Sequence, residues 1–245
     1  MKRITVFAHR NVLELLRDPL TIVFGAAFPV VLLLLLTLIS RNAPGDVFKI
    51  ETLTPGIATF GLSFFSLFAG MLVSKDRSTS FLMRLYASPL TSTDFILGYT
   101  LPLLPLALVQ ACLCYAAALA LGLPFSAATL RAIGLDLPAA LLYIALGLLA
   151  GSLLNDKQVG GLCGALLTNV SALCSGAWFP LDLVGKGFRT ACYCLPFAHA
   201  VDLGRAALSG NYDGFGIHLA VVCGYAAALI VLSVVAFRLK TTERA

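Results

Sequence analysis

The chain has 245 residues, of which 59% are hydrophobic and 12% are charged, and its formal net charge is +5. The mean hydropathy is +0.93, whereas a soluble domain carries about 25% charged residues. This composition rules against a soluble enzyme and predicts a protein embedded in lipid. The basic residues form no stripe with exposed aromatic residues, so nucleic-acid binding is not indicated.

Six charge-poor intervals are each close to the roughly 20 residues that cross a bilayer as a helix. The sequence therefore predicts an all-α integral membrane protein with six transmembrane helices and a single transmembrane domain over residues 1–245. We interpret the first interval as a retained span, because it is too long for a signal-peptide core and lacks a cleavage pattern. The intervals are residues 19–40, 53–74, 95–121, 133–154, 158–178 and 215–237.

The distribution of basic residues predicts the orientation of these spans. With the N-terminus inside, eleven of the 17 basic residues fall in inner segments and six in outer segments, while the acidic residues divide six and six. This is the asymmetry that the positive-inside rule requires. We expect a multi-pass protein of the bacterial cytoplasmic membrane with both termini cytoplasmic. Residues 75–94 and 155–157 are then inside, and residues 41–52 and 179–214 are outside.

Residues 1–18 are predicted to form an amphipathic interfacial helix. Arg3, Arg10 and Arg17 recur every seven residues, on the face opposite a set of apolar side chains. Such a helix lies in the headgroup layer of the membrane. The alternative interpretation is a basic flank that only sets the orientation of the first span.

A polar island at residues 74–90 follows the second interval. Phe81, Leu82 and Leu85 fall on one side of a helix within it, although the island is otherwise polar and basic. An apolar stripe in such a loop has no reason to stay exposed, so we expect a soluble partner to cover it.

Four of the polar side chains within the predicted spans are singled out, because polar groups inside a membrane are costly unless paired. They suit either a translocation path or hydrogen bonding between helices, and we favour hydrogen bonding. No Asp or Glu lies well inside any of the six intervals, which weakens a proton-coupled carrier. The four residues are Gln110, Thr168, Asn169 and Ser171.

Residues 179–214 are predicted to form an outer re-entrant helical hairpin between spans five and six. Residues 188–195 and 198–208 suit two short helices around Pro196, each too short to cross the membrane. The second helix carries polar residues at i, i+3 and i+6, which we interpret as structural pairing rather than a gate. These are His199, Asp202 and Arg205.

The sequence shows no motif for catalysis or for a bound cofactor. It contains no Walker A pattern and no nucleophile elbow, and its seven cysteines have no metal-ligand spacing. We therefore expect no enzyme, no metal and no cofactor in this chain. A disulfide joining Cys192 or Cys194 to Cys174 is chemically possible, but we favour simple packing of these thiols.

Three groups of residues resemble one known family in their order and spacing. The first contains Asp76, Arg77, Leu85, Ser88, Pro89 and Leu90 in the polar island. The second contains Phe179, Pro180 and Pro196, and the third contains Arg205 and Gly210. Over essentially its whole length the chain resembles the membrane subunit of type-2 ABC exporters. Ser78, Ser80 and Phe81 depart from that family's loop pattern.

This resemblance implies a permease subunit that exports an amphiphilic substrate, such as a drug, a lipid or a glycan-lipid, and that lacks its own ATPase site. It implies two ABC nucleotide-binding subunits, which bind ATP and Mg²⁺, and a second permease copy or a related permease. A cytoplasmic coupling helix over residues 75–92 would contact the nucleotide-binding subunit. The contact residues would be Asp76, Arg77, Phe81, Leu82, Leu85, Tyr86 and Pro89.

Two other classes of function remain open from the sequence. One is a stand-alone secondary carrier or channel, and the other is a scaffold subunit of a membrane enzyme complex. The sequence leaves the substrate open, and also whether the permease pairs with itself or with a relative.

Overall fold

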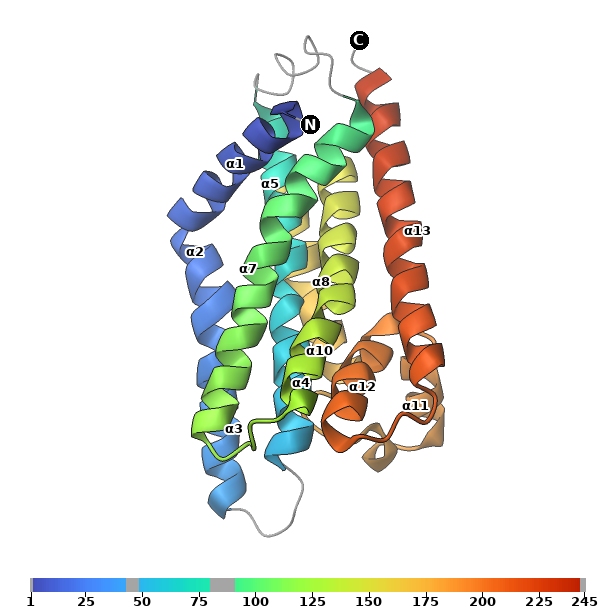
Figure 1. The fold of residues 1–245 in the computed structure, drawn as a ribbon. Coiled ribbons are helices and arrows are strands. Elements are labelled where there is room, and N and C mark those ends of the chain that lie inside the picture. The colour runs from blue at the N-terminus through green and yellow to red at the C-terminus, as the bar shows by residue number, and fades with distance from the viewer. Residues whose placement is uncertain (1, 43–48, 80–90, 243–245) are drawn as a thin grey trace.

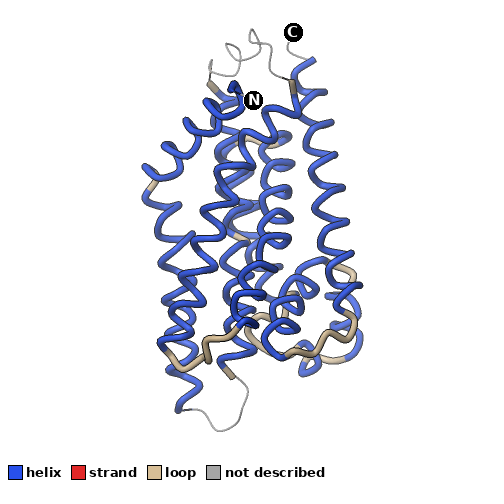
Figure 2. Tube along the Cα trace, viewed as in Figure 1, coloured by secondary structure: helices blue, strands red, loops and turns tan. Residues whose placement is uncertain are grey.

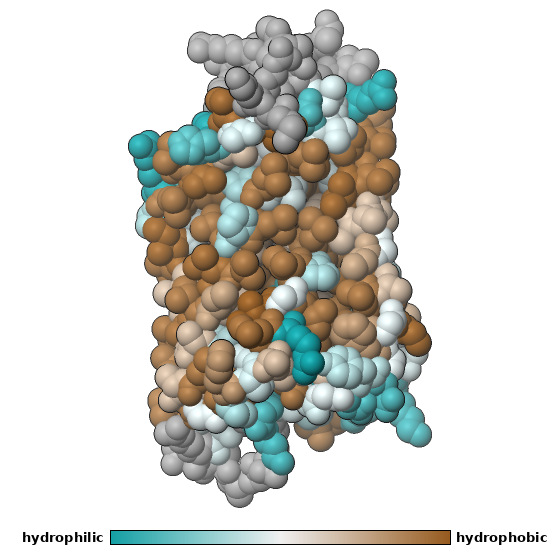
Figure 3. Space-filling model, viewed as in Figure 1, coloured by the Kyte–Doolittle hydropathy of each residue, from teal (hydrophilic) through white to brown (hydrophobic). Residues whose placement is uncertain are grey.

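A computed structural model describes residues 2–42, 49–79 and 91–242 of the chain. These ranges are helical with short connections and contain no strand (Figures 1 and 2). The N- and C-terminal ends lie at the same end of the molecule (Figure 1). Brown apolar side chains cover much of the face in Figure 3, and most of the polar ones gather toward its two ends.

Five helices are long and apolar enough to cross a membrane: Pro19–Ser40, Ile50–Ser78, Ser92–Ala120, Ala127–Leu153 and Phe215–Leu239. The first comprises α2 (Pro19–Ile22), a π-helical turn (Val23–Ala27) and α3 (Phe28–Asn42). The second comprises α4 (Ile50–Leu62) and α5 (Phe64–Ser78). The others are α7 (Ser92–Ala120), α8 (Ala127–Leu153) and α13 (Phe215–Thr242).

The predicted fifth span differs from these five. It is helical up to Cys174, as α9 (Asp156–Val159), a π-helical stretch (Gly160–Leu167) and α10 (Thr168–Cys174), and its last four predicted residues form a turn. However, this segment is short and includes polar residues such as Lys157 and Asn169, so it is not among the long apolar helices. Five of the six predicted spans are therefore present as long apolar helices in the described residues.

Helix α1 (Lys2–Arg17) packs against α7 near the end that carries the termini. Phe7, Asn11 and Leu15, spaced four residues apart, are buried, whereas Val6 and Leu16 are exposed. The ring of Phe7 meets Tyr99 of α7 edge to face, with ring centroids 4.9 Å apart. Packing on α7 therefore buries one face of α1 within the protein.

Small residues bring α5 and α8 into close contact. Ser66 and Gly70 of α5 face Gly147 and Gly151 of α8, so both helices present a pair of small residues four positions apart. A Cβ added at Gly151 would lie 2.5 Å from the carbonyl oxygen of Gly70. Close backbone approach of this kind is a common way for helices to associate in membranes. It makes α5 and α8 one tightly packed pair.

The second apolar helix is interrupted at Ser63, which separates α4 from α5. Ser63 is fully buried, and its hydroxyl group has no hydrogen-bond partner. Its carbonyl oxygen accepts bonds from the backbone and the side chain of Ser66. The interruption therefore lies inside the protein, next to the contact between α5 and α8.

Two short helices lie at the end opposite the termini: α11 (Lys186–Tyr193) and α12 (Pro196–Ser209). They follow a short 3₁₀ turn, Leu181–Leu183. Pro196 occupies the first turn of α12, where its missing N–H costs nothing. Gly210 ends the helix with φ +72°, which only glycine adopts freely. Helix α12 packs on α4, α8 and α13.

Candidate functional site

The predicted coupling residues fall in two groups. Phe81, Leu82, Leu85, Tyr86 and Pro89 lie outside the described residues, so their contacts stay a prediction. Asp76 and Arg77 lie in the last turns of α5, just before this segment. Both therefore lie at the end of the molecule that carries the termini (Figure 1).

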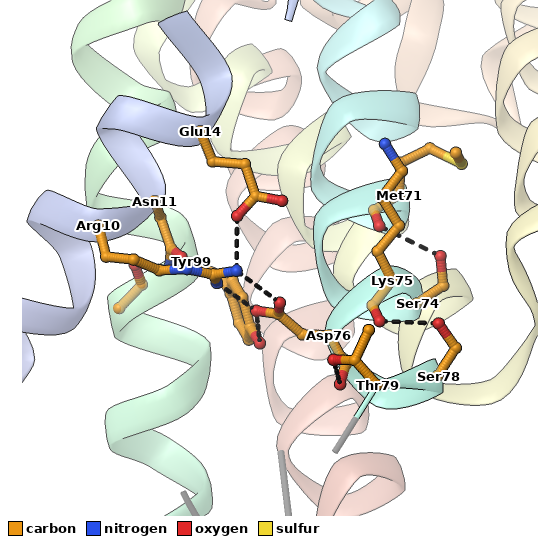
Figure 4. A network of polar contacts seen from close by, with 11 residues as sticks. Arg10, Asn11, Glu14, Met71, Ser74, Lys75, Asp76, Ser78, Thr79 and Tyr99 are labelled. Carbon is orange, nitrogen blue, oxygen red and sulfur yellow. Dashed lines mark hydrogen bonds and ion pairs between the residues drawn. The ribbon is translucent and has the colours of Figure 1, made fainter. Parts of the chain in front are cut away.

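The carboxylate of Asp76 is buried in a network within the chain (Figure 4). The guanidinium of Arg10 donates to both oxygens of Asp76, at 2.5 and 2.8 Å. The hydroxyl of Tyr99 donates to the same carboxylate at 2.9 Å, and Arg10 also pairs with Glu14 at 2.6 Å. Bidentate pairing with Arg is among the strongest hydrogen-bonded arrangements in proteins.

A second contact fastens α1 to α7 beside this network. The side-chain amide of Asn11, fully buried, donates to the carbonyl oxygen of Gly98 at 3.0 Å. A Cβ at Gly98 would collide with the ring of Phe7. The position therefore requires glycine, and α1, α5 and α7 are joined where residues 80–90 begin.

Arg77 binds the end of α8. Its guanidinium donates to the carbonyl oxygen of Gly151 at 2.7 Å and to that of Leu154 at 3.4 Å. The last carbonyl groups of a helix lack partners within the helix, and a cation is favourable there. The side chains of Asp76 and Arg77 thus bind helices of this chain, and the contact with a partner subunit that the resemblance implies stays a prediction.

An open cleft lies beside Arg77 at this end of the molecule. Its volume is about 530 Å³. The turn between α8 and α9 forms one wall, where Asn155 and Gln158 make a capping box. The cleft is lined by Ser74, Arg77, Ser78, Leu153, Leu154, Asn155, Asp156, Lys157 and Gln158.

The four polar residues of the predicted spans do not form one path. Gln110 and Ser171 are buried in the interior, where Ser171 bonds the hydroxyl of Tyr143. Gln110 donates to the carbonyl oxygen of Ala58 at 3.4 Å. Both residues therefore bond between helices, which is the interpretation that the sequence favours.

Thr168 and Asn169, in contrast, line a cavity of about 460 Å³. The rest of its wall is aromatic and aliphatic. The rings of Phe60 and Trp178 are 5.3 Å apart and meet edge to face within it. The remaining lining residues are Phe28, Phe64, Gly164, Ala172, Leu173 and Phe179. This is an apolar cavity with two polar side chains at its wall.

Arg205 holds the short helices to the long ones at the opposite end. Its guanidinium donates to the carbonyl oxygen of Gly176 at 2.6 Å and to that of Thr52 at 3.2 Å. Asp202 lies 3.7 Å from it. Burial lowers the pKa of Arg205, and the charge of Asp202 partly offsets this effect. Arg205 thus connects α12 to the start of α4 and to the turn after α10.

His199 and Asp202 extend this set of contacts toward α11 and α13. Nδ1 of His199 lies 2.7 Å from Nδ1 of His218, and the Tyr193 hydroxyl donates to Asp202 at 2.6 Å. Burial and the hydrogen bond to Asp202 raise the pKa of Tyr193 to about 12. These contacts of His199 and Asp202 connect α12 to α13 and α11. Phe179 and Pro180 lie before the 3₁₀ turn, and Phe179 packs near Leu181.

One buried acid was not predicted from the sequence. Asp136 is buried within α8, although the sequence suggests that no acid lies well inside a span. One oxygen lies 3.5 Å from the Thr59 hydroxyl, and the other has no hydrogen-bond partner. Asp136 stands near the start of the predicted apolar interval, which placed it at the edge of the span. Helix α8 begins earlier, at Ala127, so Asp136 lies well inside it.

Arg10 and Tyr99 were also missed as partners of Asp76, and Asn11 was missed as the residue that bonds Gly98. They come from segments far apart in the sequence, and no local pattern links them. The described cysteines are free thiols, and Cys174 packs beside Cys192. Within the described ranges, no group of three His, Cys, Asp or Glu residues is arranged to hold a metal ion.

A comparison with protein families matches residues 2–208 to the family model described as ABC-2 type transporter. The match includes all five predicted coupling residues outside the described ranges, as well as α1, the residues of the Arg10 network and all of α12 except its last residue. No curated protein matches the chain.

Proposed function

The chain belongs to the ABC-2 type transporter family, and we propose that it is the permease subunit of an exporter driven by ATP. It moves an amphiphilic substrate outward across the bacterial cytoplasmic membrane. Two separate nucleotide-binding subunits supply ATP hydrolysis with Mg²⁺, and a second copy of the permease completes the transporter as a homodimer.

One observation carries this proposal beyond the family. The helix ends around residues 80–90 are fastened together, because Asp76 ties α5 to α1 and α7 while Arg77 ties α5 to α8. A displacement of the segment after α5 is therefore transmitted to four helices, α1, α5, α7 and α8. Rigid-body displacement of packed helices is a common form of switching, and a coupling segment needs such a base.

The cleft beside Arg77 supports the position of the nucleotide-binding subunit. Its lining includes Ser78, which precedes the segment of the predicted apolar stripe in the sequence, and the cleft is open to the surface. The stripe of Phe81, Leu82 and Leu85 would anchor the subunit, and the polar cleft would form part of the rim. A buried anchor with a polar rim is the usual anatomy of protein interfaces.

The aromatic cavity around Thr168 and Asn169 supports an amphiphilic substrate. Phe and Trp side chains bury apolar surface, while the two polar side chains provide hydrogen bonds. In this proposal the α9–α10 segment is the fifth of six spans. The termini are cytoplasmic, and α11 and α12 form the outer hairpin.

A labelling experiment tests the orientation. Single cysteines replace Asn42, Thr79 and Asp213 in a cysteine-free chain, and intact cells are treated with an impermeant thiol reagent. Asn42→Cys and Asp213→Cys should react, and Thr79→Cys should react only after the cells are opened. The reverse pattern would refute the orientation, and labelling at all three positions in intact cells would refute the topology.

The coupling proposal is tested by Leu85→Ala and its matched control Leu85→Met, which nearly conserves volume. Truncating a well-packed anchor costs on the order of 2 kcal/mol or more, so Leu85→Ala should lose the nucleotide-binding subunit on purification. Leu85→Met should retain it, together with ATPase activity and vesicle transport. Full partner binding and transport by Leu85→Ala would contradict the proposal.

A stand-alone carrier is the second candidate, and Asp136 is the observation that favours it. Carriers use acids inside the membrane to couple ion movement to transport, and Asp136 is such an acid. Transport by the purified chain alone, driven by an ion gradient without ATP and abolished in Asp136→Asn, would establish this function in place of the first.

A further inference from the structure

A second cavity lies where α1 meets α2, beside α5 and the α9 region. Its volume is about 200 Å³. Charged and apolar side chains both line it, unlike the aromatic cavity described above. The lining residues are Glu14, Leu15, Asp18, Leu20, Thr21, Leu67, Phe68, Met71, Leu72, Lys75, Asp156 and Gly160.

The two kinds of side chain are separated along α5. Lys75 is eight residues after Leu67, which corresponds to about 12 Å along a helix. Lys75 lies in the last turn of α5, toward the end of the molecule that carries the termini, whereas Leu67 and Phe68 lie near the start of this helix. Figure 4 shows Lys75 one turn from Met71, with Glu14 on the facing α1. Such a gradient fits a molecule with a polar head and an apolar tail.

The charge of the lining favours a cationic head. Three carboxylates, those of Glu14, Asp18 and Asp156, face one ammonium group, that of Lys75. Asp18 is already bonded to the start of α2, at Leu20 and Thr21.

Asp156 is the open acceptor in this set. Its Oδ1 is buried and has no hydrogen-bond partner, and an unsatisfied buried oxygen calls for a donor. Glu14 shares Arg10 with Asp76. Burial raises the pKa of Glu14, and the positive charge of Arg10 only partly offsets this effect. A further cation would therefore be favourable at both carboxylates.

We propose that this cavity binds a phospholipid with an ethanolamine head group. The ammonium group of the lipid donates to Asp156 and Glu14, and its phosphate pairs with Lys75. The first part of an acyl chain lies against Leu67 and Phe68. A choline head group has no N–H donor for Asp156, and a glycerol head group has no cation, so both should bind more weakly. The proposal goes beyond transport and requires only that this end of the bundle lies at a membrane surface.

The test measures lipid binding to the purified full chain by native mass spectrometry, with matched ethanolamine, choline and glycerol phospholipids. We expect about a tenfold preference for ethanolamine over choline, which corresponds to about 1.4 kcal/mol. Asp156→Asn should remove this preference, and Lys75→Met should weaken all three phospholipids. Asp182→Asn, an exposed acid at the opposite end, is the matched control and should bind as the unmodified chain does.

Two further measurements decide between ligands and guard against misfolding. Dodecylammonium has the cation and the tail but no phosphate, so Lys75→Met should leave its binding unchanged or improve it. If Lys75→Met has this effect on the ethanolamine phospholipid as well, the lipid assignment is wrong. In the unmodified chain, a photoactivatable ethanolamine phospholipid should label the peptide that contains residues 67–75. Labelling elsewhere, or equal binding of choline and ethanolamine lipids, would overturn the proposal.

Discussion

Arg10 and Asp76 are 66 residues apart in the sequence, and the guanidinium of Arg10 donates to both carboxylate oxygens of Asp76. The Asp76 side chain is almost completely buried, whereas that of Arg10 is about one third exposed. The buried charge of Asp76 therefore depends on this ion pair more than the charge of Arg10 does. Its charge lies inside the protein, and Arg10 is the cation that the structure pairs with it.

Arg10→Ala should accordingly destabilise the protein by about 3 kcal/mol, because it leaves a buried carboxylate without its cation. Removing the charge in the double variant Arg10→Ala, Asp76→Asn should recover much of this loss. The measurement is thermal unfolding in detergent. Arg17→Ala, on the exposed surface of the same helix, is the control and should change stability little. A double variant less stable than Arg10→Ala would contradict this reasoning.

The contact between α5 and α8 predicts opposite results for two glycines of α8. Gly147→Ala should destabilise the fold by about 3 kcal/mol, because its Cβ would overlap the backbone of Ser66. A Cβ added at Gly134 would meet open space, so Gly134→Ala should stabilise the helix by up to about 1 kcal/mol. Denaturant titration of both variants compares them directly. Equal effects would show that the contact is looser than described.

Arg205 should be more important for stability than a surface arginine. Arg205→Met leaves the carbonyl groups of Thr52 and Gly176 without their donor, which should cost about 3 kcal/mol. Arg189→Met is the matched control, because Arg189 makes an exposed pair with Asp182 and should cost less than about 1 kcal/mol. Similar unfolding temperatures for the two variants would argue against the role of Arg205.

Tyr193 should make stability depend on pH in the alkaline range. Its pKa rises from 10.0 to about 12 because burial and Asp202 disfavour the phenolate. The unfolded chain therefore ionises first, and the stability due to Tyr193 is lost as pH rises from about 10 to 12. In Tyr193→Phe this decline should be smaller. Unfolding temperatures measured across that range, with Tyr212→Phe as an exposed control, test the difference.

Asp136→Asn should leave the fold intact or stabilise it. The substitution keeps the shape of the side chain and removes an acid that makes only a long contact with Thr59. Asp136→Leu should be tolerated less well, because it changes shape and removes the partner of Thr59. Far-UV circular dichroism during heating follows both variants. A loss of more than about 1 kcal/mol in Asp136→Asn would show that the carboxylate has a partner that the fold requires.

Local patterns in the sequence predicted most of the helices. Apolar intervals located five long helices, and the short helix predicted over residues 198–208 corresponds to α12. The α9–α10 segment was harder to predict from the sequence, because Lys157, Gln158 and Asn169 make it less apolar than a typical span. A segment buried beside other helices need not be apolar on every side, so composition alone describes it poorly.

The candidate site was less accessible to sequence analysis. The family resemblance assigned the side chains of Asp76 and Arg77 to a partner subunit, and no local pattern predicted that they also bind helices of this chain. Only the packing of α1 on α7 brings Arg10 to Asp76. Similarly, Thr168 and Ser171 lie on one short helix, yet only Thr168 reaches the aromatic cavity. Such differences depend on rotation about a helix axis, which a nearly all-apolar sequence does not define.

The interruption at Ser63 divides one membrane helix into two halves, each with a close contact of its own. On one side α5 is seated on α8 through glycines, and on the other α4 is close to α12 through Gly204 and Pro55. Helices α4 and α5 can therefore move with different parts of the protein. A displacement of α5 near the termini would change the angle between α5 and α4 at Ser63. Both close contacts, that of α5 with α8 and that of α4 with α12, would then stay in place.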